Sequence, residues 1–405
     1  MRILQKIRDV RLLSHIGYSY SSIAALVARA TVAKAFGQRH SRSRFESFAA
    51  ARSDPFAVAF RLTGGIGDHI ISARYVRDLQ RFAGPFIFDV FSSRPDIAKW
   101  LFKDVAGFRD AYDDYFSWPI GYQSYPLAMW IIQFALVFVS EANWKAINRN
   151  ASKLAKVCES CERFRSKIAP MIDHHPRLDG ALGQAAIYRG LNRYSLLHAM
   201  SGIPYGGHKF PLSSDPRALA KFGLDPGRYV TIHNGFDDLF VIGSSYAKRS
   251  TKTYPHFGQV AAMVRRTFPD LAVVQIGTKT SQPIPGSSLD LVGSTTLQET
   301  VELIRHSRLH IDNESGLVHI AASLGTQSCV VFGPTSVDYF AYEKNINVRP
   351  PFCGGCWWST EDWMVNCPKG FDHPKCLHET APSIVFDAIH RVLANDRANV
   401  LAIAD

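Results

Sequence analysis

The residues best suited to chemistry lie between positions 312 and 319, directly after the apolar segment 309–311. They comprise two carboxylates, a turn of small residues and a histidine: Asp312, Glu314, Ser315, Gly316 and His319. The pattern predicts a strand that turns into a helix, and the free N–H groups at a helix start suit a diphosphate. Glu314 is placed to accept hydrogen bonds from a ribose. An ordinary βαβ crossover with a tight turn is the alternative interpretation.

A second candidate site follows the first strand-like segment, at Thr63-Gly-Gly-Ile-Gly-Asp68. A carboxylate after a strand can take a proton from a bound hydroxyl as a general base. Asp is also a common helix cap, which is the structural alternative for Asp68. The glycines, among them Gly65 and Gly67, allow a sugar or phosphate to approach the backbone closely.

Both segments resemble glycosyltransferase family 9, the ADP-heptose:lipopolysaccharide heptosyltransferases and their relatives. The matching positions are Ser315, Gly316, His319, Ala321, Ala322, Gly325 and Phe332 to Thr335. The glycines before Asp68 resemble the first turn of that family. Glu314 departs from the pattern, because the family usually has the shorter Asp at this position.

The resemblance implies an inverting glycosyltransferase that uses an ADP-sugar, with heptose as the expected sugar and Asp68 as the base. A Lys or Arg commonly precedes Trp-Pro in the family, and Lys252, two residues before Tyr254-Pro255, matches best. A cation there would neutralise the departing diphosphate. Lys248 and Arg249 are further candidates, and a solvated loop charge is the structural alternative. His233, at the end of a strand, is expected to contact the donor or to be a structural polar residue.

The expected acceptor is a bacterial surface glycan or lipopolysaccharide precursor, with a protein acceptor as an open alternative. Two other functions compete with this one: a non-catalytic nucleotide-sugar-binding protein and a sugar-nucleotide epimerase. Asp312 and Glu314 superficially resemble an Asp-x-Asp metal motif. We nevertheless expect no catalytic metal, because Lys252 and helix N–H groups can stabilise the diphosphate instead.

Four cysteines gather near the C-terminus: Cys353, Cys356, Cys367 and Cys376. The C-x₂-C spacing followed by two more thiols predicts a tetrahedral thiolate site for structural zinc or iron. Unligated buried thiols and disulfides are the alternatives. A related cysteine cluster occurs in much of the family.

The net charge of +11 is concentrated at the N-terminus, where residues 1–52 hold ten Lys or Arg against two Asp or Glu. This excess need not imply nucleic-acid binding. Helical apolar spacing in the segment predicts either contact with an anionic membrane surface or a solvated tail. With no apparent export signal, we expect a cytoplasmic protein, peripheral on the inner face of the bacterial inner membrane. The apolar run 127–139 is too short for a span and predicts a buried or interfacial helix.

Alternating strand-like and helix-like segments predict an α/β fold with two doubly wound parallel sheets, and the resemblance implies that they face a cleft in the glycosyltransferase B architecture. The expected order is a basic helical extension (1–52), an acceptor-side Rossmann-like domain (53–205), a linker (206–228), a nucleotide-sugar-binding Rossmann-like domain (229–380) and a C-terminal helix (381–405). The Cys-rich loop spans residues 353–376. Thr296 and Glu299 predict a capping box at the start of a helix.

Overall fold

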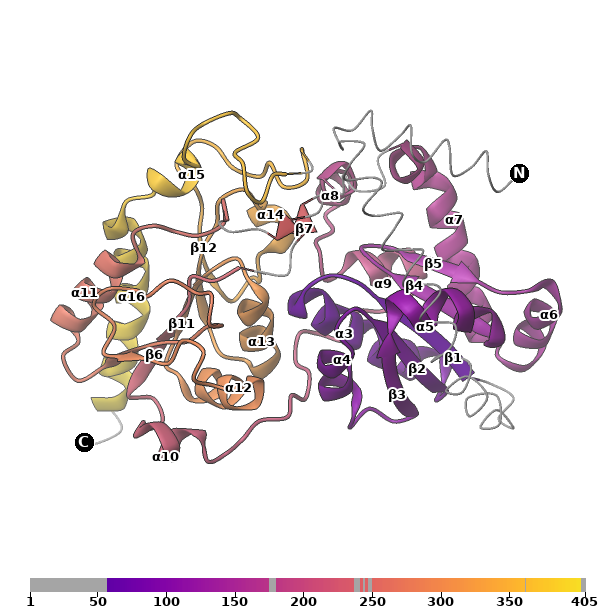
Figure 1. Ribbon diagram of the computed structural model, residues 1–405, viewed down its shortest axis with the longest axis horizontal. Helices are drawn as coiled ribbons and strands as arrows, with labels where there is room; N and C mark the ends of the chain where they lie inside the picture. The colour runs from indigo at the N-terminus through magenta and orange to yellow at the C-terminus, as the bar shows by residue number, and fades with distance from the viewer. Residues whose placement is uncertain are drawn as a thin grey trace.

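The structure, a computed structural model, describes residues 57–174, 180–236, 241–242, 245–246, 250–360 and 362–401. Two sheets with flanking helices lie side by side (Figure 1). The predicted basic extension, 1–52, and two candidate cations, Lys248 and Arg249, fall outside the described residues. None of the helices in the described segments is both long and apolar enough to cross a bilayer.

The first sheet has the strand order β3-β2-β1-β4-β5, parallel except for β5. Its strands are β1 (Ala57–Leu62), β2 (Ile87–Ser92), β3 (Phe108–Asp113), β4 (Leu127–Ile131) and β5 (Ala135–Phe138). Its helices are α3 (Ile66–Ala83), α4 (Pro95–Phe102), α5 (Asp114–Gly121), η1 (Tyr122–Ser124), α6 (Glu141–Asn150), α7 (Ser152–His174), α8 (Gly180–Tyr188) and α9 (Leu196–Ser201). Apart from Arg61, which is partly exposed, β1 is buried, as expected for a parallel strand covered on both faces.

The prediction of a helix over residues 127–139 is wrong. The segment forms β4 and β5, an antiparallel hairpin in which Met129 pairs with Val137. Gln133 lies between the two strands. A strand buried on both faces reads as an unbroken apolar run, and such a run cannot be distinguished from a buried helix by periodicity.

The second sheet has the order β10-β9-β6-β11-β12-β13, and all its strands are parallel. Its strands are β6 (Tyr229–Ile232), β9 (Ala272–Gln275), β10 (Leu289–Asp290), β11 (His310–Asn313), β12 (Ser328–Val331) and β13 (Ile346–Val348). Its helices are α11 (Phe257–Thr267), α12 (Leu297–His306), α13 (Gly316–Leu324), α14 (Val337–Phe340), α15 (Lys375–His378) and α16 (Pro382–Leu401). A short helix, α10 (Ala218–Phe222), precedes this sheet, and β7 (Val241–Ile242) pairs with β8 (Ser245–Tyr246).

Local signals account for the helix starts that matter for function. Thr296 and Glu299 form the predicted capping box of α12, each side chain bonded to the other's backbone N–H at 3.2 and 2.7 Å. Ser315 caps α13 and accepts a hydrogen bond from the Leu317 N–H at 3.1 Å. Gly64 has a φ of +100°, which glycine adopts readily, and this lets the chain turn from β1 into α3. Both α3 and α13 therefore begin directly after a central strand.

Candidate active site

A cleft of about 830 Å³ lies between the two sheets and is lined by residues from both. Most of its lining follows the carboxyl ends of strands, the edge at which α/β folds bind ligands. All the predicted catalytic and donor-binding residues line this one cleft: Gly65, Gly67, Asp68, His233, Lys252, Glu314, Ser315, Gly316 and His319. Residues from two motifs more than 240 positions apart thus surround the same space.

Asp68 lies in the first turn of α3 and makes two contacts inside the protein. Its Oδ2 accepts a hydrogen bond from the Gly65 N–H at 3.1 Å, which is the capping role. Its Oδ1 accepts a hydrogen bond from Arg193 at 2.6 Å. The Arg193 side chain is 3% exposed whereas that of Asp68 is 38% exposed. The carboxylate is therefore held in place and still accessible from the cleft.

Two glycines allow the starts of α3 and α13 to touch. A Cβ at Gly67 would lie 2.4 Å from Cδ2 of His319, and a Cβ at Gly316 would lie 2.1 Å from Cγ2 of Ile66. Each contact joins one sheet's helix to the other's, and Figure 1 shows α3 and α13 facing each other at the boundary. Both positive helix ends therefore face one cleft, which favours an anionic ligand.

Replacing Gly67 with Ala is expected to lower the free energy of unfolding by about 1–3 kcal/mol, because the methyl group overlaps the His319 ring. Urea unfolding measures this change. The control is His319→Ala, in whose background Gly67→Ala is expected to cost less than about 0.5 kcal/mol because the ring is gone. A Gly67→Ala protein as stable as the wild type would show that this contact is loose.

Lys252 and Glu314 form an ion pair, and both residues line the cleft. The Lys252 Nζ donates to Glu314 Oε2 at 2.6 Å, and His319 Nε2 lies 3.8 Å from Oε1 of the same carboxylate. Burial raises the pKa of Glu314, but the Lys252 ammonium and His319 outweigh burial and lower this pKa to about 2. Glu314 is therefore a carboxylate at any physiological pH, and Lys252 has a fixed position beside it.

A buried network from the first sheet sets the orientation of His319. Arg74, fully buried in α3, donates to the Tyr342 hydroxyl at 2.8 Å. The hydroxyl can then donate its own hydrogen to His319 Nδ1, 2.6 Å away. Burial also lowers the pKa of His319, which favours the neutral ring. The remaining proton therefore lies on Nε2, which faces Glu314 and the cleft.

Asp312 belongs to a different network from Glu314. Its side chain is completely buried; Oδ1 lies 2.8 Å from Nδ1 of His233, and Oδ2 accepts from the Ser315 hydroxyl at 2.5 Å. His310 approaches Oδ2 at 3.1 Å. Burial alone raises the pKa of Asp312, but the two histidines lower it on balance. Its oxygens are engaged by protein groups, so Asp312 holds His233 and Ser315 in place.

His233 uses both ring nitrogens within the protein. Nδ1 donates to Asp312, and Nε2 accepts from the Gly235 N–H at 3.2 Å. This arrangement corresponds to the structural alternative that the sequence left open. His233 still lines the cleft. Because both of its nitrogens are engaged, we expect the ring to contact a ligand by van der Waals packing and not by a hydrogen bond.

Several cleft residues were not expected from the sequence. Arg193, the partner of Asp68, is 125 positions away and belongs to no motif. Gln133 comes from the hairpin that was predicted as a helix, and Thr278 and Lys279 come from the loop after β9. Trp357, Trp358 and Trp363 belong to the Cys-rich loop, which was predicted as a metal site and not as part of the cleft, yet all three line the cleft.

The four predicted metal-ligating cysteines are free thiols in the segment between β13 and α16, with Cys376 in the short helix α15. Burial, and after it the neighbouring thiols, raise the pKa of Cys376 to about 12 and that of Cys356 to about 11. Within the described residues, no group of three or more His, Cys, Asp or Glu side chains is arranged to hold a metal ion.

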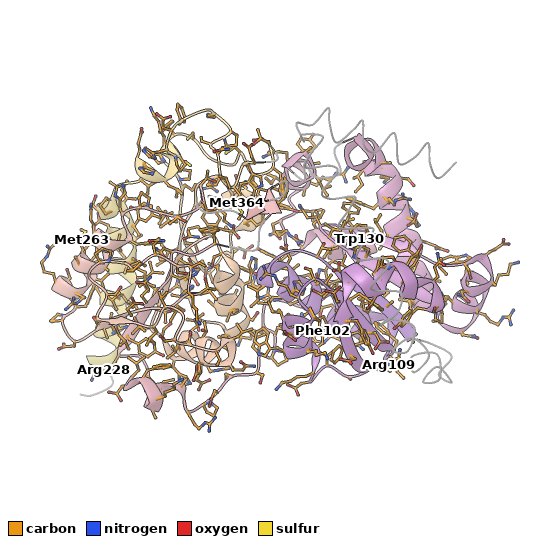
Figure 2. The ribbon with its side chains drawn as sticks, viewed as in Figure 1. Phe102, Arg109, Trp130, Arg228, Met263 and Met364 are labelled. Atoms are coloured by element: carbon orange, nitrogen blue, oxygen red, sulfur yellow. The ribbon has the colours of Figure 1, made fainter. Side chains whose placement is uncertain are left out.

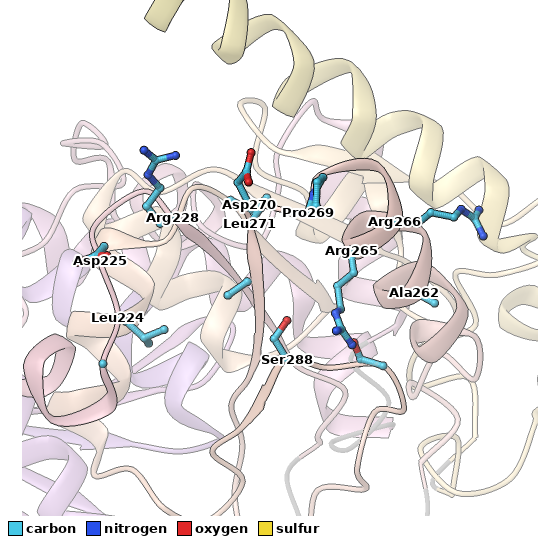
Figure 3. A pocket seen from close by; sticks show the side chains of 13 residues that line it. Leu224, Asp225, Arg228, Ala262, Arg265, Arg266, Pro269, Asp270, Leu271 and Ser288 are labelled. Atoms are coloured by element: carbon cyan, nitrogen blue, oxygen red, sulfur yellow. The ribbon is translucent and has the colours of Figure 1, made fainter.

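A second pocket, of about 690 Å³, opens elsewhere on the second sheet, among Arg228, Arg265 and Asp270 (Figure 3). None of the predicted functional residues lines it. Arg228 and Arg266 extend away from its centre in Figure 3. The cleft between the sheets is therefore the better candidate for an active site.

Comparisons with known proteins agree with these motifs. The profile of glycosyltransferase family 9 (heptosyltransferase) matches residues 192–350. Lipooligosaccharide heptosyltransferase 2 of Haemophilus influenzae is 35% identical over 68 residues, which is 16% of this chain and 20% of that protein. The Haemophilus ducreyi protein of the same name is 43% identical over 53 residues, 13% of this chain and 15% of its own. The chain thus matches a fifth or less of the length of these curated relatives.

Solved structures extend the likeness to the fold. The structure of E. coli ADP-heptose LPS heptosyltransferase II aligns with a TM-score of 0.50 and 14% identity, covering 84% of this chain and 100% of that one. TibC, an iron-containing dodecameric glycosyltransferase from enterotoxigenic E. coli, aligns with a TM-score of 0.55 and 13% identity, covering 84% of this chain and 77% of its own. The predicted α/β architecture of two parallel-sheet domains is confirmed. The resemblance to glycosyltransferase family 9 is likewise confirmed for the motif at residues 312–335, which lies within the matched residues 192–350, whereas the turn before Asp68 lies outside them.

Proposed function

We propose that the protein is an inverting glycosyltransferase that moves a sugar, heptose by family likeness, from an ADP-sugar to a glycan acceptor. The observation that carries the proposal is the meeting of Asp68 with the Lys252–Glu314–His319 cluster around one cleft. A candidate base from one sheet thus faces a candidate diphosphate site from the other. Such an arrangement suits transfer between two substrates held by different domains.

In the proposed reaction, an acceptor hydroxyl gives its proton to the Asp68 carboxylate. The oxygen attacks the anomeric carbon of the donor and forms the new glycosidic bond. The bond from that carbon to the diphosphate oxygen breaks, and the nucleoside diphosphate leaves with the electron pair. Attack from the face opposite the leaving group inverts the anomeric configuration.

The second sheet supplies the groups that hold the leaving diphosphate. The Lys252 ammonium, with one hydrogen bonded to Glu314, keeps further N–H donors for phosphate oxygens. The N-terminus of α13 at Gly316 and the Nε2–H of His319 add neutral donors. Glu314 is proposed to accept from the ribose. These groups are positioned before reaction and act most strongly when charge develops on the diphosphate.

The choice of substrates comes from the relatives. The curated relatives are named lipooligosaccharide heptosyltransferases, and one solved TibC structure holds ADP-D-β-D-heptose. We therefore propose an ADP-activated heptose and an acceptor that is a lipopolysaccharide or other bacterial surface glycan precursor. A protein acceptor is the alternative, and the experiment described next also detects it. This function would place the protein in the cytoplasm, at the inner face of the inner membrane.

The test follows ADP release from ADP-heptose with and without an acceptor extract. A glycosyltransferase releases ADP quickly only when the acceptor is present, and mass spectrometry finds the acceptor one sugar heavier. An epimerase would convert the donor without acceptor, and a binding protein would retain the donor unchanged. Either result would overturn the proposal.

No catalytic divalent metal is expected at Asp312 and Glu314. Asp312 has its oxygens on His233, His310 and Ser315, and Glu314 is paired with Lys252. Incubation with EDTA followed by desalting is therefore expected to leave the transfer rate within about twofold of the untreated rate. A loss of rate that Mg²⁺ or Mn²⁺ restores would contradict this expectation.

We propose that the Cys-rich loop holds a structural zinc or iron. Four thiols within residues 353–376 suit such an ion, because a bound cation stabilises the thiolates that burial and, after it, the neighbouring thiols disfavour. Elemental analysis is expected to find about one ion per chain. Cys356→Ser is expected to lose the ion and lower the melting temperature, whereas Cys329→Ser, a buried cysteine outside the loop, is expected to keep it.

A further inference from the structure

One end of the cleft is walled by aromatic side chains that the proposed reaction does not use. Trp357, Trp358 and Trp363 come from the Cys-rich loop, and Phe340 comes from α14. Trp357 packs edge-on against Phe340, with ring centroids 4.9 Å apart. Met364 of the same loop also lines the cleft and lies on the side of the second sheet that faces the first (Figure 2). We call Trp357, Trp358, Trp363 and Phe340 the aromatic wall.

Polar groups accompany the aromatic wall. Gln133 is 3% exposed and lines the cleft, and its Oε1 accepts from the Tyr339 hydroxyl at 2.6 Å. The Tyr339 ring lies 5.6 Å from that of Trp357. Trp363 is 3% exposed, and its indole N–H is buried without a hydrogen-bond partner in the described part of the chain. An aromatic surface beside an amide and an unpaired N–H suits a ligand that has both apolar faces and hydroxyl groups.

The aromatic wall is connected to Asp68 by contacts in the first sheet. The Nη2 atom of Arg193 donates both to Asp68 Oδ1, at 2.6 Å, and to the Ile132 carbonyl, at 3.3 Å. Ile132 is the neighbour of Gln133, which in turn bonds to Tyr339 beside Trp357. The wall therefore lies on the side of the cleft where the proposed base is held.

Another part of the cleft lining comes from the second sheet alone. The loops after β9 and β10 contribute Thr278, Lys279 and Gly293 there, close to the start of α12. A donor with its diphosphate on Lys252 and its nucleoside against these loops would leave the aromatic wall to the second substrate.

We propose that the aromatic wall with Gln133 is a subsite for a sugar ring of the glycan acceptor. The ring stacks its C–H face on the tryptophans, and its hydroxyls bond to the Gln133 amide and the Trp363 N–H. This inference rests on the proposed function and adds to it the site that recognises the acceptor. It also gives the Cys-rich loop a role in substrate binding besides any metal.

The loop that forms the wall is fastened beside Lys252. The Thr251 N–H donates to the Met364 carbonyl at 2.8 Å, and the Thr251 hydroxyl donates to the Trp363 carbonyl at 2.8 Å. Thr251 precedes Lys252 directly. The acceptor subsite and the diphosphate-binding lysine are therefore held in one fixed relation, as in-line attack requires.

The test measures binding of two ligands to three proteins. ADP is the donor probe, and oligosaccharides released from bacterial lipooligosaccharide are the acceptor probes. Trp358→Ala is expected to weaken oligosaccharide binding about tenfold and to leave the ADP dissociation constant within about twofold. Phe352→Ala is the matched control, because Phe352, directly before the Cys-rich loop, is a 56% exposed aromatic that does not line the cleft. Thermal unfolding confirms that both variants fold.

Saturation-transfer NMR on the wild type identifies the stacked protons, which are expected to be ring C–H groups of one sugar. Equal oligosaccharide binding by Trp358→Ala and wild type would overturn the subsite, as would a wild type that binds ADP but no oligosaccharide. Loss of ADP binding in Trp358→Ala would instead assign the wall to the nucleobase. A wild type that does not bind ADP would refute the proposed function itself, which separates the two failures.

Discussion

Replacing Asp68 with Asn is expected to lower the rate of sugar transfer by about 10²–10⁴-fold, the usual contribution of a general base. The amide oxygen can still accept from the Gly65 N–H, so the start of α3 is preserved. The amide cannot take the acceptor proton at neutral pH. ADP binding, measured by calorimetry, is expected to stay within about threefold, because the proposed diphosphate contacts come from the other sheet.

Asp114→Asn is the matched control for Asp68→Asn. Like Asp68→Asn, it weakens an Asp–Arg pair of the first domain, because Arg61 donates to Asp114 at 2.9 Å. Asp114, however, does not line the cleft. It is expected to change stability without a specific loss of turnover. If Asp68→Asn behaves like this control, Asp68 is only a cap and the mechanism must be abandoned.

Asp68 illustrates what a local sequence motif can predict. The glycine turn after an apolar strand predicted a carboxylate just beyond the end of that strand, and Asp68 lines the cleft there, because strand, turn and helix are adjacent in sequence. The same holds for Glu314 to His319 after β11. The two interpretations of Asp68, cap and base, turn out to be compatible. One oxygen bonds to Gly65, the other to Arg193, and the side chain remains partly exposed.

The residues that the sequence did not reveal come from long-range packing. Arg193 reaches Asp68 from a segment with no motif, and Arg74 reaches Tyr342 across 268 positions. Gln133 was concealed because the surrounding apolar run has no period that separates a buried hairpin from a helix. The tryptophans of the Cys-rich loop were visible in the sequence. They line the cleft because the loop folds back against Thr251, which donates hydrogen bonds to the carbonyls of Trp363 and Met364.

Replacing Lys252 with Met is expected to lower the turnover by at least about 10²-fold, the loss typical when one preorganised charge-stabilising donor is removed. Binding of the free nucleoside is expected to change less, because the ammonium matters most when the diphosphate leaves. Lys221→Met is the matched control. Lys221 makes an equally short pair with Glu299, 2.6 Å, but does not line the cleft, so its loss is expected to leave turnover unchanged.

The stability of Lys252→Met should depend on pH in a defined direction. In the wild type the pKa of Glu314 is lowered to about 2, so this group is ionised, folded or unfolded, from pH 5.5 upward and adds no pH dependence there. Without the ammonium, only His319 opposes burial, the largest influence on the pKa of Glu314, so we expect this pKa to rise above its ordinary 4.5. A raised folded-state pKa penalises folding increasingly as pH rises through it. The variant is therefore expected to lose about 3–5 kcal/mol at pH 8, the cost of breaking a buried pair, and less at pH 5.5.

Glu314→Gln in the Lys252→Met background separates the electrostatic cause from a general packing defect. The double variant has no buried carboxylate to ionise, so its stability relative to the wild type is expected to be the same at pH 5.5 and pH 8. Its turnover is expected to stay low, because restoring neutrality does not restore a cation for the diphosphate. A double variant that regains activity would show that Lys252 serves only to neutralise Glu314, and the role in catalysis would then pass to other donors at the start of α13.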